Sequence, residues 1–254
     1  MRGGKYALLV ALAFAFWAPA AWAEDDIQKR CTKDIWSRQL DVVDGPPFAS
    51  FDGDVLCLFG EITDEGAHET VDIIKKHKIK SVLVTSNGGS VNGALDIAEE
   101  ILANGIDVYV SHSCLSSCAN YIFLAGRKKY VLELGMVAWH GAPVYTKEKA
   151  AALDDAAKER LERTVARHNA FYARVGADPR LAGEFPCDLK KTREFLAMAT
   201  EIETEHDVLW TYPREILEGK FHVDGLKAMW SPGGTTAIQS YRQWKRVFLV
   251  KGCG

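Results

Sequence analysis

Three short segments carry the residue types of serine acyl-transfer chemistry, and they follow one another along the chain. Residues 85–91 have the pattern of a strand that ends in a Gly88-Gly89 turn. Ser117 follows at the start of a helix, and His140 lies at the end of a later strand. A glycine turn can offer amides to an oxyanion, a hydroxyl can attack a carbonyl, and an imidazole can take its proton. The order and spacing of the three segments favour an enzyme.

Each role has a physical reason. A serine hydroxyl is a weak nucleophile until a base removes its proton, and His140 is the candidate base for Ser117. The N–H groups of Gly89 and Cys118 are the candidate oxyanion donors, since a helix start leaves amides unpaired and glycine lets the backbone approach closely. Taken singly, the serine is a helix cap, the glycines are a turn and the histidine is structural. The combination favours catalysis. His112 is interpreted as structural and His206 as a surface residue.

Residues 1–23 have the pattern of an export signal. Arg2 and Lys5 precede an apolar run at 6–18, and Ala21-Trp22-Ala23 fits a cleavage site. An uncleaved membrane anchor is the alternative, because residues 6–23 are 18 apolar residues in a row, which is the short limit for a span. Cleavage would leave no stable membrane span and would place the protein in the periplasm or outside the cell.

Net charge and cysteine content limit the partners and the kinds of site that this protein can have. The formal net charge of −3 becomes −5 when the two basic leader residues are removed, which argues against a nucleic-acid partner. An oxidising compartment permits disulfides among the six cysteines, whose pairing the sequence does not decide. A bridge between Cys114 and Cys118 would make the turn before the nucleophile rigid. Cys57 lies in an apolar strand pattern that indicates a buried thiol. Only His112 could join the cysteines near Ser117 as a ligand, so no metal site is expected.

Short apolar strands alternate with amphipathic helices, which predicts an α/β fold built from parallel units. Strands are expected at 55–60, 81–85, 107–111, 130–132 and 136–139, and helices at 64–78, 91–103, 117–125, 190–200 and 213–218. Residues 146–175 predict one long amphipathic helix with a solvated charged face. The expected organisation is an N-terminal extension (24–53), a hydrolase domain (54–228) and a C-terminal extension (229–254).

The chemistry-bearing segments resemble the Clp protease proteolytic subunit and its Clp/crotonase superfamily. That family has a strand, a Gly-Gly-Ser-Val turn, a serine that opens an apolar helix, and a strand that ends in histidine shortly before proline. Here the matching stretches are residues 86–91, 116–126 and 136–143. The resemblance extends from about residue 54 to residue 145. It implies a core of repeated β-β-α units arranged as a spiral, with a long projecting helix that packs subunits into an oligomer. Residues 146–175 suit that helix.

The resemblance also implies an acid for the triad. Asp207 lies before a short apolar stretch and a helix, as the family's aspartate does, and Glu203 is the reserve. Its role would be to hold the imidazole tautomer. The chain departs from the family pattern at Asn87, where proline is usual, and in about 20 residues around 183–198 that look inserted. Since an exported protein would lack the family's ATP-driven chaperone, we expect ATP-independent activity.

The leading hypothesis is therefore an exported serine peptidase that uses Ser117, His140 and Asp207 on a peptide or protein substrate and needs no cofactor. A Ser–Lys dyad is the second enzyme hypothesis, with Lys147, Lys149 or Lys158 as base; their charged helix argues against it. A coenzyme A thioester activity is disfavoured by export. A non-catalytic scaffold or peptide-binding protein that keeps the fold is the hypothesis from another class.

Overall fold

The computed structural model describes residues 26–33, 47–143, 146, 151–183, 208–229 and 247–250. The expected leader, the helix expected at 190–200, and both candidate acids, Asp207 and Glu203, lie outside the described residues. Within the described part of the chain, no helix combines the length and apolar character that crossing a bilayer requires.

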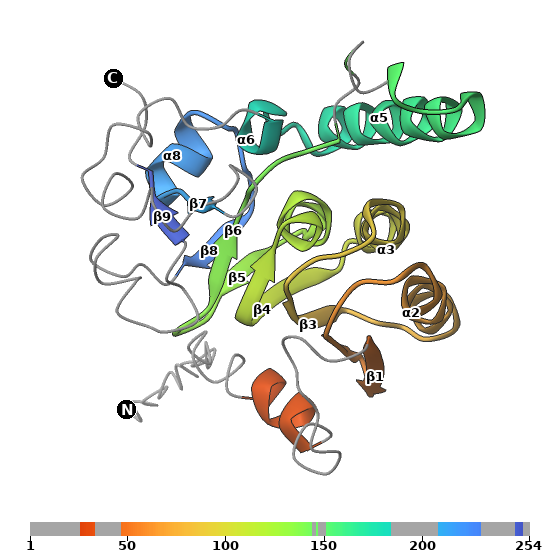
Figure 1. Cartoon of the computed structure of the whole chain (residues 1–254). Helices are drawn as coiled ribbons and strands as arrows, with labels where there is room; N and C mark the ends of the chain where they lie inside the picture. The colour runs from red at the N-terminus through yellow and green to blue at the C-terminus, as the bar shows by residue number, and fades with distance from the viewer. Residues whose placement is uncertain are drawn as a thin grey trace, which may run out of the picture.

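A mostly parallel sheet of seven strands lies at the centre of the described chain (Figure 1). Its strands are β1 (Phe48–Asp52), β2 (Val55–Phe59), β3 (Ser81–Ser86), β4 (Asp107–Leu115), β5 (Lys129–Val131), β6 (Met136–Ala138) and β8 (Leu226–Met229). The order is β1-β2-β3-β4-β5-β8, with β6 paired to β4. Only β1, which comes from the expected N-terminal extension, pairs antiparallel among these described strands. The alternation of strands and helices in the sequence thus correctly predicts an α/β protein.

Helices α2 (Asp64–Lys76) and α3 (Val91–Asn104) cover one face of this sheet (Figure 1). Thr63 caps α2 by accepting the Gly66 N–H at 3.1 Å, and Ser90 caps α3 in the same way. A π-helix, η1 (Cys118–Phe123), follows β4 and packs beside α3. Buried apolar residues of the strands and these helices form the main core, which Leu56 and Leu58 of β2 join. The alternate residues of β2 belong to a second cluster on the other face, so β2 is buried along its whole length.

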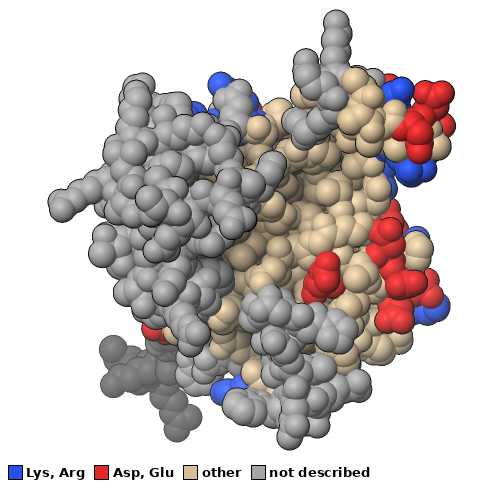
Figure 2. Space-filling model, in the orientation of Figure 1, with Lys and Arg blue, Asp and Glu red and all other residues tan. Residues whose placement is uncertain are grey.

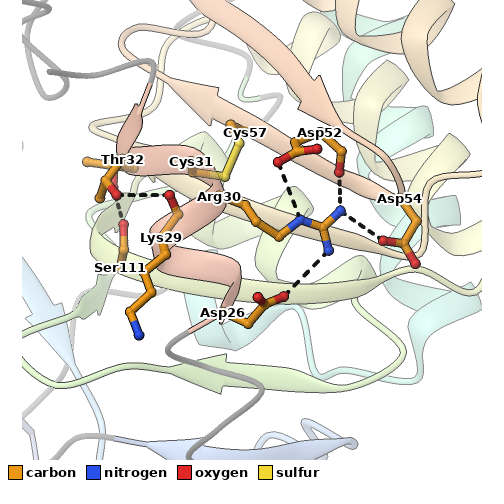
Figure 3. The surroundings of a disulfide bond; sticks show 10 residues. Asp26, Lys29, Arg30, Cys31, Thr32, Asp52, Asp54, Cys57 and Ser111 are labelled. Carbon is orange, nitrogen blue, oxygen red and sulfur yellow. Dashed lines mark hydrogen bonds and ion pairs between the residues drawn. A yellow bond between two sulfur atoms is a disulfide. The ribbon is translucent and has the colours of Figure 1, made fainter. Parts of the chain in front are cut away.

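The other face of the sheet is covered in part by a short helix at residues 26–33 (Figure 3). A disulfide joins Cys31 of this helix to Cys57 of β2, so the interpretation of Cys57 as a thiol is wrong. Arg30 donates to the Asp52 carbonyl and, at 3.0 Å, to Asp54 Oδ1. This contact with Arg30 is the main reason why the pKa of Asp54 is lowered. The sequence pattern of β2 could not reveal the bridge, because its partner lies 26 residues earlier.

The long helix α5 (Asp155–Val175) crosses above α3 and η1 in Figure 1. It begins nine residues later than expected, where Asp154 caps it by accepting the Ala157 N–H at 2.7 Å. Its buried residues are His168, Phe171 and Tyr172, all in its C-terminal half. Arg167 pairs with Asp96 of α3 at 2.6 Å. The earlier half of α5 is therefore the more exposed half, as a solvated charged face predicts.

The C-terminal part adds a second small sheet. Strands β7 (Leu209–Thr211) and β9 (Val247–Leu249) pair in parallel, next to the short helices α6 (Arg180–Gly183) and α8 (Arg214–Gly219) (Figure 1). Trp210 of β7 exchanges two 2.8 Å backbone hydrogen bonds with Trp139, directly after β6. The small sheet is thereby attached to the strand that leads to His140.

Charge is unevenly distributed over the face shown in Figure 2. Among the described residues, acidic side chains gather over the α2 and α3 side, and mixed charges lie at the far end of α5. The described surface between them is largely uncharged.

Candidate active site

The last residues of β4 bring two distant segments together. β5 pairs with Val108–Val110 of β4, and β6 takes over as the partner of Ser113–Leu115. The register between β3 and β4 shifts between Val84 and Ser86, which lets β4 continue past the end predicted at residue 111. Because β4 and β6 run parallel, their carboxyl ends meet at one edge of the sheet. The residues that follow them, Ser116 and His140, therefore come to lie side by side.

Ser116 is the serine that contacts the imidazole. Its Oγ lies 2.6 Å from Nε2 of His140, and its N–H donates to the Ala138 carbonyl at 3.0 Å. The backbone of Ser116 has a φ of +55°. A non-glycine residue in this left-handed region costs about 1–2 kcal/mol. Such strain persists only where the surroundings impose it, and it is common at functional sites.

Ser117, which the sequence predicted as nucleophile, has a different partner. Its hydroxyl donates to the Gly89 carbonyl at 3.2 Å, and the residue is only 2% exposed. Ser116, in contrast, is half-buried. The structure thus brings His140 to the first serine of the pair and directs the second toward the glycine turn.

The helix after the serine pair is wound as a π-helix rather than as the expected α-helix. Asn120 N–H donates to the Ser116 carbonyl at 2.9 Å, and η1 follows directly. The Asn120 side chain is 3% exposed and donates from Nδ2 to the Gly141 carbonyl at 2.9 Å. This bond ties η1 to the residue after His140. Single π-turns in proteins occur frequently at functional sites.

The Gly88-Gly89 turn passes directly beside the serines. A Cβ on Gly88 would lie 2.8 Å from the Ser116 Cβ and 3.1 Å from the Ser117 nitrogen. A Cβ on Gly89, whose φ is +136°, would lie 2.2 Å from the Ile62 carbonyl oxygen. Only glycine fits at these two positions. The requirement explains the glycine pair that the sequence singled out.

The backbone of Gly89 forms a parallel bridge with Ile62. Ile62 bonds to the flanking residues, donating to the Gly88 carbonyl at 2.8 Å and accepting from the Ser90 N–H at 2.7 Å. In a parallel bridge of this kind, the central residue directs its own amide and carbonyl away from the partner. On that side the Gly89 carbonyl receives the Ser117 hydroxyl. Gly89 as a whole is exposed.

A cavity of about 240 Å³ opens at the Ser116–His140 pair. Its lining residues are Val91, Ser116, Ser117, Asn120, His140, Gly141, Ala142 and Pro143. His140 is the ionisable residue in this described lining. The cavity can therefore admit an uncharged group and place it against the hydroxyl and the imidazole.

A second disulfide joins the residues on either side of Ser116 and Ser117. Cys114, in β4, is bonded to Cys118, the first residue of η1, with a Cα–Cα distance of 5.1 Å. Both residues are fully buried. This is the bridge that the sequence raised as one possibility. Cys118 thus ties the start of η1 covalently to β4.

The other residues considered from sequence lie away from the cavity or outside the described residues. Lys158 is on α5, where it pairs with Asp155 at 3.2 Å, and Lys147 and Lys149 are not described. His112 lies in β4, where burial lowers its pKa. Across the described ranges, no three His, Cys, Asp or Glu side chains form a group suited to a metal ion.

Comparisons with known proteins find similarity in structure and none in sequence. No family model and no curated protein sequence matches the chain. Among solved structures, a mutant of ClpP1 from Listeria monocytogenes is similar at 19% sequence identity and a TM-score of 0.34. The match covers 49% of this chain and 78% of that one.

Proposed function

We propose that the protein is a serine hydrolase in which Ser116 is the nucleophile and His140 the general base. The observation that carries this proposal is the 2.6 Å separation of Ser116 Oγ and His140 Nε2 at the edge of an open cavity. A nucleophile and a base within hydrogen-bond reach are the core of serine acyl transfer. The left-handed φ of Ser116, which keeps its hydroxyl at the cavity, supports the assignment.

The reaction follows from this geometry. His140 Nε2 accepts the hydroxyl proton while Ser116 Oγ forms a bond to the substrate carbonyl carbon, and the carbonyl electron pair moves onto oxygen. The imidazolium then gives its proton to the leaving group as the scissile bond breaks. Water, activated by the same imidazole, hydrolyses the acyl-enzyme and regenerates Ser116.

The developing oxyanion needs donors that are already in place. With Ser116 as nucleophile, the amide of the next residue, Ser117, takes the role first given to Cys118. The amide of Gly89 is the second donor, as expected from the sequence. The position of Gly88, whose added Cβ would lie 3.1 Å from the Ser117 nitrogen, supports this pairing of adjacent segments.

Asp207 remains our proposed acid, with Glu203 in reserve. The described neighbour Trp210 supports this choice, because it pairs with Trp139, the residue before His140. The chain that follows Asp207 therefore runs beside the chain that carries the base. An acid in this position would hold the imidazole tautomer and stabilise the imidazolium.

For substrate and setting, we propose a peptide or protein substrate, ATP-independent action and an exported location. The uncharged lining of the cavity fits a neutral acyl group. The two disulfides fit an oxidising compartment. An oligomer built through residues 146–175 is part of the same proposal, supported by the exposed N-terminal half of α5.

A matched pair of variants tests the assignment of the nucleophile. A fluorophosphonate probe should label the wild-type protein, label Ser117→Ala, and fail to label Ser116→Ala. Loss of labelling in Ser117→Ala alone would return the nucleophile to Ser117. His140→Ala should abolish labelling, whereas full labelling of that variant with loss in Lys158→Ala would favour the Ser–Lys dyad. A folded wild-type protein that the probe does not label would favour the scaffold hypothesis.

A further inference from the structure

The disulfide at the candidate site encloses the strained serine symmetrically. Cys114 is two residues before Ser116 and Cys118 is two residues after it, and the sulfur bridge joins the two directly. The single described residue with positive φ between them is Ser116. The bridge therefore closes a small covalent ring around a residue whose backbone conformation is unfavourable.

One side of this ring is firmly anchored. Cys114 pairs with Ser86 of β3 on one side and with Val137 of β6 on the other, so it is held in the middle of the sheet. Cys118 is the first residue of η1. The bridge fixes the start of the π-helix to the sheet at a constant distance from both neighbouring strands.

Noncovalent contacts also hold the backbone and the Cβ of Ser116 in place. Its N–H bonds to the Ala138 carbonyl, and its carbonyl accepts the Asn120 N–H. The Gly88 backbone packs against its Cβ. These weak contacts oppose relaxation of φ to a negative value, and the covalent ring limits the same motion, because a change at Ser116 would separate Cys114 from Cys118.

We propose that the Cys114–Cys118 disulfide is a positioning device that holds the Ser116 hydroxyl against His140. The inference rests on the proposed function and concerns how the nucleophile of that site is kept in place. Since both cysteines are fully buried, the bridge is a permanent part of the folded site. Neither cysteine is among the residues that line the cavity, so both act through Ser116.

The other disulfide provides a matched control. Cys31–Cys57 also ties a helix to the sheet, and it lies on the opposite face, away from the serine pair. We therefore compare Cys114→Ala/Cys118→Ala with Cys31→Ala/Cys57→Ala. The rate of fluorophosphonate labelling and the kcat and KM for p-nitrophenyl acetate report function. The ring-proton NMR signals of His140 report its contact with Ser116 without any need for turnover.

We expect the Cys114→Ala/Cys118→Ala protein to fold and to label about 100-fold more slowly, since a small misplacement of a reacting group has that effect. The loss should fall on kcat, with KM little changed, and the His140 signals should shift. The control variant should keep the wild-type labelling rate, kcat and His140 signals.

Three results would overturn the inference. One is wild-type labelling and unshifted His140 signals in the Cys114→Ala/Cys118→Ala protein. Another is an equal loss of rate in both double variants, which would indicate a general effect of lost stability. A wild-type protein that is folded and never labelled would overturn the proposed function and this inference with it. If the alanine variant does not fold, Cys114→Val/Cys118→Ala restores buried volume and is judged by the same measurements.

Discussion

The Tyr121 hydroxyl lies 3.0 Å from Nδ1 of His168, and this buried contact joins the π-helix of the candidate site to α5. Burial lowers the pKa of His168 to about 4. It raises the pKa of Tyr121 above its usual value. Both groups are therefore neutral at neutral pH, and α5 is docked by an uncharged hydrogen-bonded pair.

This pair predicts a loss of stability in acid. Below pH 6.5 the unfolded chain protonates its histidine while the folded chain does not, so the free energy of unfolding falls until about pH 4. Below that pH, the titration of His168 causes no further fall in the free energy of unfolding. Relative to His168→Gln, which keeps a side-chain hydrogen bond without this titration, the wild-type protein should lose up to about 3 kcal/mol over that window. Urea unfolding at a series of pH values measures the difference, and parallel curves for the two proteins would contradict it.

The positive φ of Ser116 predicts a trade of stability against activity. Ser116→Gly removes the unfavourable Cβ contact of the left-handed conformation, whereas Ser116→Ala keeps it. We expect the glycine variant to exceed the alanine variant by about 1 kcal/mol in the free energy of unfolding. Neither should react with a fluorophosphonate. Equal stability of the two variants would show that the conformation at residue 116 is not strained.

The tight packing of the Gly88-Gly89 turn predicts that adding a single methyl group at Gly89 greatly reduces the reaction rate. In Gly89→Ala the new Cβ would collide with the Ile62 carbonyl, so the turn must move and carry the Gly89 amide with it. Loss of one oxyanion donor typically reduces the rate about 100- to 1000-fold. Gly219→Ala is the control, since a Cβ there meets no atom within 4 Å. A labelling rate for Gly89→Ala like that of the control would remove Gly89 from the site.

The two disulfides should differ in what they contribute to stability. Removing Cys31–Cys57, which spans 26 residues, should lower the free energy of unfolding by about 3.5 kcal/mol in the chain-entropy account. Removing Cys114–Cys118, which spans 4 residues, should lower it by about 2 kcal/mol. Denaturant unfolding of the two double variants tests this order. The reverse order would show that the short bridge carries enthalpic terms absent from this account.

Periodicity and turn residues were sufficient to predict most of the core. The apolar run of β2 and the amphipathic pattern of α3, ended by Gly105, are local signals, and the structure confirms both. β4 was predicted too short because its final residues are paired with β6, and a tertiary pairing leaves no local signal. β1 was missed because its polar and apolar residues show no clear alternation.

The sequence singled out His140 and the serine next to the one that contacts it in the structure. Ser117 was predicted because it lies at the start of the expected helix, whereas the structure begins a π-helix at Cys118 and brings Ser116 to His140. The left-handed conformation of Ser116 has no signature in its residue type, since serine rarely adopts it. A pair of cysteines two residues to either side of Ser116 was the available hint.

The backbone bridge between Trp139 and Trp210 has a consequence for folding during synthesis. Ser116 and His140 are synthesised early, but the strand that supports His140 is flanked by β7, and β7 needs β9 as its partner. Since β9 is the last of the described strands to be synthesised, the support is complete only after the ribosome has passed residue 249. We expect a nascent chain that stops before residue 247 to hold both reactive side chains and yet remain inert.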